Sequence, residues 1–291
     1  MSYGKVVELY LVNGDADGIV VAELSNWDGK AIKIPRSEIN TYDKNSFDDD
    51  LSQPGVYFLF VKEDDGSDSV YIGESDNIEQ RLKQHVQAYQ KENEKYYWNT
   101  AVVFIGRDLN KSFDLYLEKR FTEIARQNKR YNVFTEKTSQ CKTYKKSQQA
   151  VMEEYISNAK ILITALGYKV LDPLIAVNKQ SVKEELLYLK IGNANAVGKA
   201  TSDGFVVLRG AKINEKIAEK SLLQSMVERR KFCNKNGDIK DCKTQTDLLF
   251  SSPSTAAAFV VGYSISGPLS WKNKQGISYN EIEKNGDDRT T

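Results

Sequence analysis

The order of apolar and polar residues predicts short strands in the first part of the chain. The segments KVVELYLV (5–12), GIVVAELS (18–25) and AIKIPR (31–36) alternate or run apolar, as strands do. The turn-forming residues NGDADG (13–18) separate the first two and predict a hairpin turn. We therefore expect a small N-terminal β unit over residues 1–50. An acidic linker at 43–53 and Pro54-Gly55 mark a new start.

The next segment alternates strand and helix patterns. GVYFLFV (55–61), SVYIG (69–73) and TAVVFIG (100–106) predict three strands. Ser75 or Asp76 is the expected N-cap of a helix, with Asp76 and Glu79 as its capping box. A second helix is expected over 112–127. The apolar residues at helical spacing, which predict the buried faces, are Ile78, Leu82, Val86 and Tyr89 in the first helix and Phe113, Leu117, Phe121 and Ile124 in the second.

The rest of the chain divides into two parts. Residues 147–192 read as a helical connector that is interrupted at Gly167 and ends with SVKEELLYLK (181–190). Residues 193–285 read as a domain of short strands with a basic helix at 212–231. A further helix starts after Ser252 and ends at Gly262. The expected fold class is α/β (α+β): a core of a three-stranded antiparallel sheet flanked by helices (54–135), with the N-terminal β unit and a C-terminal α+β domain.

The composition excludes several classes of protein. With 40% hydrophobic and 28% charged residues, the chain has the balance of a folded globular protein. Its apolar runs are too short to span a membrane, and the first residues lack the pattern of a signal peptide, so we expect a cytoplasmic location and no membrane partner. Three cysteines and one histidine make a structural zinc site a poor fit.

The net charge of +1 conceals a strong segregation of charges. Residues 41–68 hold eight acidic residues and two basic ones, whereas residues 119–146 hold nine basic residues and two acidic ones. Residues 209–243 hold ten basic residues and five acidic ones. Basic blocks of this kind suit a polyanion such as nucleic acid. Solvated helix faces explain the same pattern equally well.

The only histidine, His85, lies one helical turn after Arg81, so the two side chains share a face. Around them the chain carries GVY (55–57), YIG (71–73), a glutamate at 118 and an asparagine at 132. This ordered set resembles the GIY-YIG nuclease family over residues 54–135. It departs from the motif in having Val56 in place of isoleucine, which alters no reactive group.

The resemblance implies an endonuclease that hydrolyses DNA phosphodiester bonds with Mg²⁺ or Mn²⁺, plausibly in restriction or defence. Glu118 would bind the metal, and Arg81 would hold the phosphate oxygens. Tyr57 would act as general base on water, with Tyr71 hydrogen-bonded nearby, and His85 would orient a tyrosine or relay a proton. Asn132 completes the implied catalytic set. One active site cuts one strand, so a homodimer is one route to a double-strand cut.

Two other functions stay open at this point. Each residue of the set also has an ordinary structural interpretation. A non-catalytic protein that binds nucleic acid, including modified DNA, would keep the same fold. The segment NGDADGI (13–19) is similar to part of the Asp-rich motif of DHH-type phosphoesterases and to half of a calcium loop. The further ligands that both sites need are missing from the expected positions, so a hairpin turn is the better interpretation.

The segment FSSPSTAAAFVVGYSISGPLSWKN (250–273) carries a second resemblance, over about residues 200–283. It is similar to a small uncharacterised, RAMA-like domain found beside restriction-type enzymes and suspected of sensing modified DNA. Such a domain would select or grip DNA. Trp271 would serve either to contact a base or to pack in the core.

Overall fold

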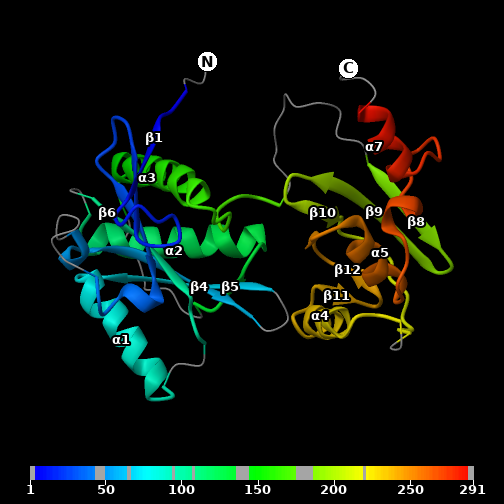
Figure 1. Ribbon diagram of the computed structural model, residues 1–291, viewed down its shortest axis with the longest axis horizontal. Helices are drawn as coiled ribbons and strands as arrows, with labels where there is room; N and C mark the ends of the chain where they lie inside the picture. Colours follow the sequence, from blue (N-terminus) through cyan, green and yellow to red (C-terminus); the bar gives the residue numbers. More distant parts are fainter. Residues whose placement is uncertain are drawn as a thin grey trace. The chain divides into compact units, whose positions relative to one another are not determined.

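The computed structural model describes residues 4–42, 50–63, 67–93, 96–106, 109–135, 144–174, 186–218 and 221–287. The chain forms two compact units, residues 1–173 and 174–291 (Figure 1), and each is described here by itself. The expected acidic linker lies largely outside the described residues, as do Cys141 and the first half of the segment 181–190. In the described part, no helix is long and apolar enough to cross a membrane.

A seven-stranded sheet organises the first unit, in the order β1-β2-β3-β6-β4-β5-β7. Its strands are β1 (Val7–Leu11), β2 (Val20–Leu24), β3 (Lys30–Pro35), β4 (Gly55–Lys62), β5 (Asp68–Ser75), β6 (Thr100–Ile105) and β7 (Asn132–Val133). All neighbouring pairs are antiparallel except β5 and β7. Two 3₁₀ turns, Arg36–Glu38 and Asp50–Ser52, flank the connection from β3 to β4. The three predicted core strands are thus the middle of a larger sheet.

The three strands of the N-terminal β unit join the core sheet. β3 pairs along its whole length with β6, so that the hairpin of β1 and β2 extends the core sheet. The turn between β1 and β2 is the predicted hairpin turn: Gly14 has a positive φ, and the Asp15 side chain accepts a hydrogen bond from the amide of Asp17. The sheet gains buried area through this pairing, because Ala31, Ile32 and Ile34 are fully buried.

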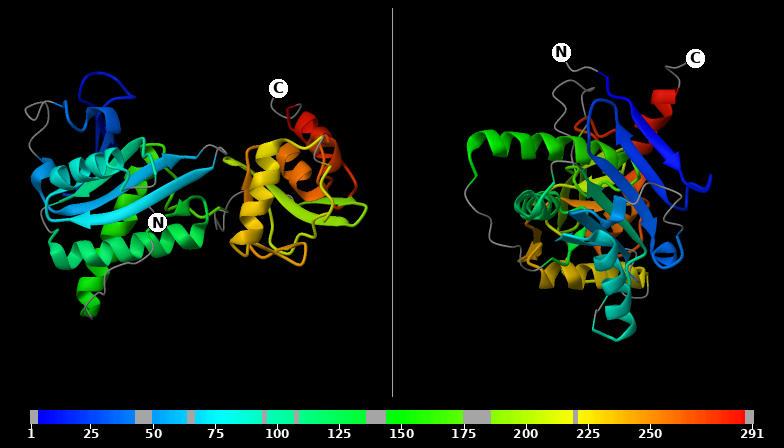
Figure 2. Two further views of the ribbon diagram at one scale, coloured as in Figure 1. Left: turned by 90° about the horizontal axis from the view of Figure 1, so that it is seen from below. Right: turned by 90° about the vertical axis from the view of Figure 1, so that its left-hand side faces the viewer.

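Helices cover both faces of the sheet. The helix α1 (Ile78–Gln90) packs on one face, against Leu59, Val61 and Val103. The helices α2 (Lys111–Asn128) and α3 (Lys146–Ala165) pack on the other, where Phe58, Phe104 and Phe121 meet. Figure 2 shows the sheet between α1 and α2. Because successive residues of a strand point to opposite faces, Tyr57 faces α1 and Phe58 faces α2.

The start of α1 differs from the prediction. Asn77 is the N-cap, and its side chain accepts a hydrogen bond from the amide of Gln80. Ser75 instead accepts from the Asn77 amide and stabilises the turn before the helix. Glu79 pairs with Lys83 rather than reaching back to the cap. Of the predicted buried face, Ile78, Leu82 and Val86 are buried and Tyr89 is exposed, because the helix end extends past the sheet.

The second unit combines a four-stranded sheet with four helices among its described residues. The sheet order is β13 (Leu248–Phe250), β10 (Gly204–Val207), β9 (Ala194–Thr201) and β8 (Leu187–Ile191), and β11 (Ile239–Lys240) and β12 (Lys243–Thr244) form a separate hairpin. The helices are α4 (Gln224–Lys235), α5 (Pro253–Val261), α6 (Gly267–Ser270) and α7 (Tyr279–Asp287). These elements give the expected α+β architecture.

Two elements of this unit were predicted wrongly. The segment 187–191, expected to end a helical connector, is strand β8, in which Leu187 and Leu189 are buried and Lys190 is exposed. This alternation is the period of a strand. The basic helix expected at 212–231 begins only at Gln224, because the amides of Lys212 and Ile213 bond to other extended segments rather than to a helical turn.

The predicted helix after Ser252 is confirmed. Ser252 caps α5, Pro253 is its first residue, and Gly262 ends it in the left-handed conformation. Gly267-Pro268 begins the short helix α6 rather than a plain turn. Trp271 is fully buried, contacts Phe205 and donates its indole N–H to the carbonyl of Pro253. Trp271 is therefore a core residue and is not available to contact a base.

Candidate active site

The two tyrosines of the predicted catalytic set lie on neighbouring strands of the first unit. Tyr57 on β4 pairs with Gly73 on β5, and Tyr71 lies two residues before Gly73 on the same face. A Cβ atom on residue 73 would lie 2.5 Å from the Tyr57 hydroxyl and 2.9 Å from the ring of Tyr71. Glycine is thus required at the end of the YIG segment, because the Tyr57 ring lies across its backbone.

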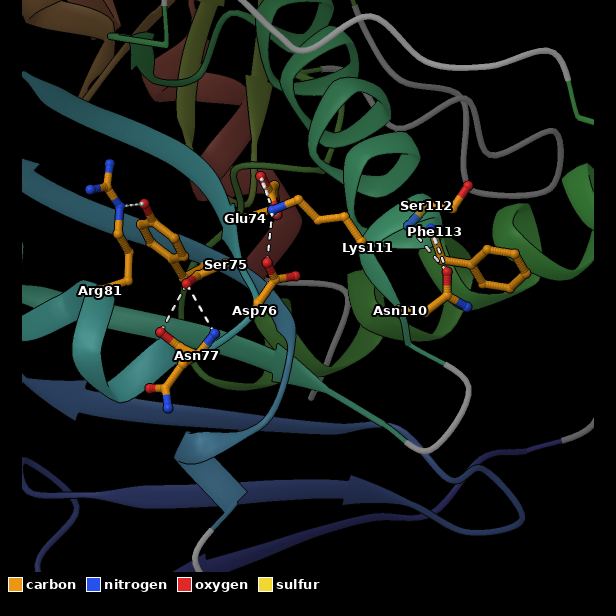
Figure 3. Close-up of polar contacts among 10 residues, drawn as sticks. Glu74, Ser75, Asp76, Asn77, Arg81, Asn110, Lys111, Ser112 and Phe113 are labelled. Carbon is orange, nitrogen blue, oxygen red and sulfur yellow. Dashed lines mark hydrogen bonds and ion pairs between the residues drawn. The ribbon is translucent and has the colours of Figure 1, made fainter.

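The Tyr57 hydroxyl is held by two side chains of α1. Arg81 Nε donates a hydrogen bond to it over 3.1 Å (Figure 3), and the hydroxyl lies 2.9 Å from His85 Nε2. Arg81 and His85 can both reach Tyr57 because residues four apart on a helix share a face. The other end of the guanidinium donates to Gln84 Oε1 over 3.2 Å. We call Tyr57, Tyr71, Arg81 and His85 the tyrosine cluster.

Aromatic rings enclose the tyrosine cluster. The ring centroids of Tyr57 and Tyr71 are 6.1 Å apart, and the imidazole of His85 lies 5.5 Å and 5.4 Å from them. Tyr71 stacks on Tyr96. Tyr57 is 1% exposed and His85 is 6% exposed. This packing holds the Tyr57 hydroxyl in one orientation.

Burial raises the pKa of Tyr57 well above its usual range, and the neighbouring Tyr71 raises it further. The positive charge of Arg81 and its hydrogen bond lower the pKa of Tyr57, but they do not offset burial. Tyr57 is therefore a neutral phenol at neutral pH. Since its oxygen accepts the Arg81 hydrogen bond, its own proton is left for His85 Nε2.

Glu118 lies on α2, the helix that packs mainly against β5 and the opposite face of the sheet. Its side chain is 7% exposed. It is flanked one turn before and one turn after by Asp114 and Thr122, both fully buried. We call Asp114, Glu118 and Thr122 the carboxylate stripe.

Sequence reasoning missed Asp114. Neither carboxylate oxygen of Asp114 has a hydrogen-bond partner in the described part of the protein. The pKa of Asp114 is raised from 3.8 to about 7, mainly by burial and also by the charges of Glu74 and Asp76, against the opposing effect of Lys111. Asp114 lies four residues before Glu118, so the two side chains share a helix face. The sequence around Asp114 gives no sign that this carboxyl group is buried.

Lys111, at the first turn of α2, links this helix to the end of β5. Its Nζ lies 2.8 Å from Glu74 Oε2 and 3.4 Å from Asp76 Oδ2 (Figure 3). Asn110 caps α2 through the amides of Ser112 and Phe113. The cap and the ion pairs therefore fix the start of α2 against the strand that carries Tyr71.

The predicted chemistry implies a divalent metal, which needs oxygen ligands from the protein. Among the described residues, no three or more His, Cys, Asp or Glu side chains are grouped as a metal site. Mg²⁺ often keeps several waters and uses one or two carboxylates of the protein. Glu118, a buried carboxylate, fits this one-carboxylate form of site.

Asn132 lies nearer to Tyr71 of the tyrosine cluster than to Tyr57, because its partner Ser69 is two residues from Tyr71 on β5. It pairs with Ser69 on β5, four residues from the Gly73 that pairs with Tyr57, which along a strand is about 13 Å. Its side-chain amide donates to Ser67 Oγ over 3.4 Å. The structure thus places Asn132 in strand pairing, and its catalytic role stays a prediction.

Comparison with known families agrees with this geometry. Residues 53–132 match the model of the GIY-YIG catalytic domain, and residues 187–283 match a domain of unknown function, DUF4357. No curated protein and no solved structure matches the chain. The two matched segments account for the two motifs singled out from the sequence. The chain carries a GIY-YIG nuclease domain followed by an uncharacterised DUF4357 domain.

Proposed function

We propose that this protein is a metal-dependent endonuclease that hydrolyses phosphodiester bonds of DNA. The observation that carries the proposal is the hydrogen-bonded contact of Tyr57 with both Arg81 and His85 inside a GIY-YIG domain. A phosphodiester hydrolase needs a route for the proton of water and a cation that binds the phosphate. The tyrosine cluster offers both.

In this proposal the proton leaves water by way of Tyr57. The Tyr57 oxygen takes up the proton of the attacking water while the phenolic proton moves to His85 Nε2, 2.9 Å away. No free phenolate is needed in this relay, which matters because burial disfavours the phenolate. His85 Nε2 is the proton acceptor in this relay, so the ring proton of His85 lies on Nδ1.

Arg81 binds the phosphate in the same proposal. Its Nε is already used by Tyr57, so the terminal nitrogens are the donors for the phosphate oxygens. Gln84 accepts from one of these nitrogens and can be displaced by substrate, because it is exposed. The guanidinium thus couples the position of the phosphate to the position of the Tyr57 hydroxyl.

Glu118 would hold Mg²⁺ or Mn²⁺. When bound, the metal supplies positive charge for the phosphoryl oxygen and the leaving group. Asp114, one turn away, makes the environment of Glu118 more acidic and favours a cation there. One site cuts one strand, so a nick is the expected first product. In this proposal the enzyme acts in the cytoplasm, in restriction or defence, and the DUF4357 domain binds or selects the DNA.

Plasmid nicking tests the proposal. The parent protein, Glu118→Ala and Glu123→Ala are incubated with supercoiled plasmid in Mg²⁺, Mn²⁺ or EDTA, on unmodified and base-modified DNA. Glu123 is the matched control, because it lies on the same helix and pairs with Arg120 at the surface. We expect metal-dependent nicking by the parent and by Glu123→Ala, and its loss in Glu118→Ala.

Two results would contradict the proposal. Nicking that persists in EDTA or in Glu118→Ala would remove Glu118 from its metal-binding role. Absence of nicking on every DNA, together with salt-sensitive binding, would favour the non-catalytic DNA-binding protein.

A further inference from the structure

A continuous row of polar residues crosses five extended segments of the DUF4357 domain. Adjacent members of this row are direct cross-strand partners in antiparallel pairs. The pairs are Lys190 with Asn195, Asn195 with Lys212, Lys212 with Lys243, and Lys243 with Lys240. We call Lys190, Asn195, Lys212, Lys243 and Lys240 the lysine row. Segments as far as 31 residues apart along the chain, those of Lys212 and Lys243, are thereby aligned side by side.

Backbone hydrogen bonds support this alignment. Asn195 and Lys212 exchange two N–H···O bonds of 2.9 Å and 2.8 Å, as a hydrogen-bonded antiparallel pair does. Lys212 and Lys243 form the other type of pair, flanked by bonds from Ile213 to Cys242 and from Thr244 to Ala211. Side chains approach more closely in this second type of pair.

All five side chains lie on the solvent side. Direct partners in an antiparallel pair project to the same face, and all five residues of the row are exposed. Their neighbours in the sequence point the other way: Leu189, Ala194, Ala211 and Ile239 are buried in the core of this unit. The alternation of buried apolar and exposed cationic residues therefore creates a one-sided basic surface.

The dimensions of the row suit the backbone of a duplex. Neighbouring extended segments lie about 4.8 Å apart, so the five positions span about 19 Å. A duplex lying along the row presents roughly five or six phosphates of each strand over that length. The long lysine side chains can adapt to the phosphate positions without a fixed geometry.

The lysines of the row have no ion-pair partner among the described residues. In the described part of the protein, no carboxylate forms an ion pair with Lys190, Lys212, Lys240 or Lys243. Like charges directly opposite each other in strands are destabilising. Lys240, Lys243 and Lys212 are three such neighbours in succession. A polyanionic ligand would relieve this repulsion.

The basic helix singled out by the sequence offers a poorer surface. In its RRK run, Arg230 is buried and donates to the carbonyls of Phe259 and Asn214. Arg229 lies over the ring of Phe250 and donates to the carbonyl of Leu249. Both guanidinium groups therefore hold the domain together. Lys231 and Lys235 are the exposed basic residues that remain on α4.

We propose that the lysine row is the surface by which the DUF4357 domain binds the phosphate backbone of duplex DNA. The choice of DNA as the polyanion rests on the proposed function, whereas the row itself rests on strand pairing and exposure. Contacts with phosphates carry no base information. The row accordingly positions the duplex and strengthens its binding independently of sequence.

Binding of a fluorescent DNA duplex of mixed sequence to the full chain in EDTA tests the row. The parent is compared with Lys212→Gln/Lys243→Gln and with the control Lys231→Gln/Lys235→Gln, which removes the same charge from α4. For the row variant we expect affinity lower by on the order of tenfold to a hundredfold near 0.1 M salt, and a salt slope smaller by about 2. The control should keep the affinity and slope of the parent.

Thermal unfolding distinguishes lost contacts from lost folding. The row variant should unfold at the same temperature as the parent or higher, because it loses a like-charge pair. Parent-like affinity in the row variant would overturn the proposal, and so would an equal loss in the α4 control. Plasmid nicking is measured separately. If the row variant loses DNA affinity but the parent does not nick plasmid, the proposal for the lysine row holds and the proposed nuclease activity is contradicted.

Discussion

The tyrosine cluster and the carboxylate stripe are both buried in the same compact unit. They differ in whether their buried polar atoms have hydrogen-bond partners. In the tyrosine cluster, the Tyr57 hydroxyl has partners on both sides, Arg81 and His85. In the carboxylate stripe, both oxygens of Asp114 and the hydroxyl of Thr122 lack a hydrogen-bond partner in the described part of the protein. The Tyr57 hydroxyl is thus satisfied within the fold, whereas Asp114 and Thr122 have no hydrogen-bond partner among the described residues.

The difference indicates different roles. A satisfied buried network holds its atoms in place, as proton transfer requires. Burial without hydrogen-bond partners disfavours the ionised form of a carboxyl group. Ionised Asp114 therefore lowers the stability of the folded protein, and binding of a proton or a cation would restore that stability. We infer that the tyrosine cluster is organised before substrate binds, whereas the stripe depends on what binds beside it.

Removal of the Tyr57 hydroxyl should have the largest effect on activity. Tyr57→Phe should lower nicking by about a hundredfold or more, because the proton relay loses its central atom. Its free energy of unfolding should fall by only about 1 kcal/mol. Nicking rates and urea unfolding measure the two effects.

Tyr155→Phe is the matched control for this substitution. Tyr155 is another tyrosine of the same unit, and its hydroxyl donates to the carbonyl of Ile105 on the opposite face of the sheet. It should lose similar stability and keep full nicking. Equal activities of the two variants would show that the Tyr57 hydroxyl is only structural.

Arg81→Lys should have the next largest effect on activity. Lysine keeps the charge but cannot donate to Tyr57 and fork onto a phosphate at the same time. We expect nicking to fall on the order of tenfold to a hundredfold with little change in the unfolding temperature. Lys83→Gln, on the same helix, is the control, because Lys83 pairs with Glu79 instead. Full activity of Arg81→Lys would place Arg81 outside the site.

Asp114→Asn should show how much the buried carboxyl group of Asp114 lowers the free energy of unfolding. The pKa of Asp114 is raised from 3.8 to about 7 in the folded protein. The unfolded chain therefore loses this proton at lower pH than the folded protein does, and the parent loses stability between these two values as pH rises. Asparagine removes that loss, so the variant should be more stable by a few kcal/mol at about pH 8 and similar to the parent at about pH 4.

Urea unfolding in EDTA across this pH range measures the difference. Glu154→Gln is the control, because Glu154 is exposed on α3. A difference between Asp114→Asn and the parent that does not change with pH would show that Asp114 is ionised equally in both states.

Local patterns were the best guide to the core of the nuclease domain. The spacing of Arg81 and His85 places them on one helix face, and the structure joins both to Tyr57. The strand β8 also had a local signal, since Leu187 and Leu189 alternate with Tyr188 and Lys190. Asp114 had no local signal, since its importance comes from burial.

The sequence by itself determined the strands of the core, the helix α5 with its cap and terminating glycine, and the presence of two domain motifs. These features depend on residues near each other in the chain, through side-chain periodicity and capping. Only the tertiary structure decided that the first three strands extend the core sheet, that Trp271 is buried and that Asn132 lies away from Tyr57. It also aligned the lysine row. Pairing between distant segments sets these features, and composition and spacing do not encode that pairing locally.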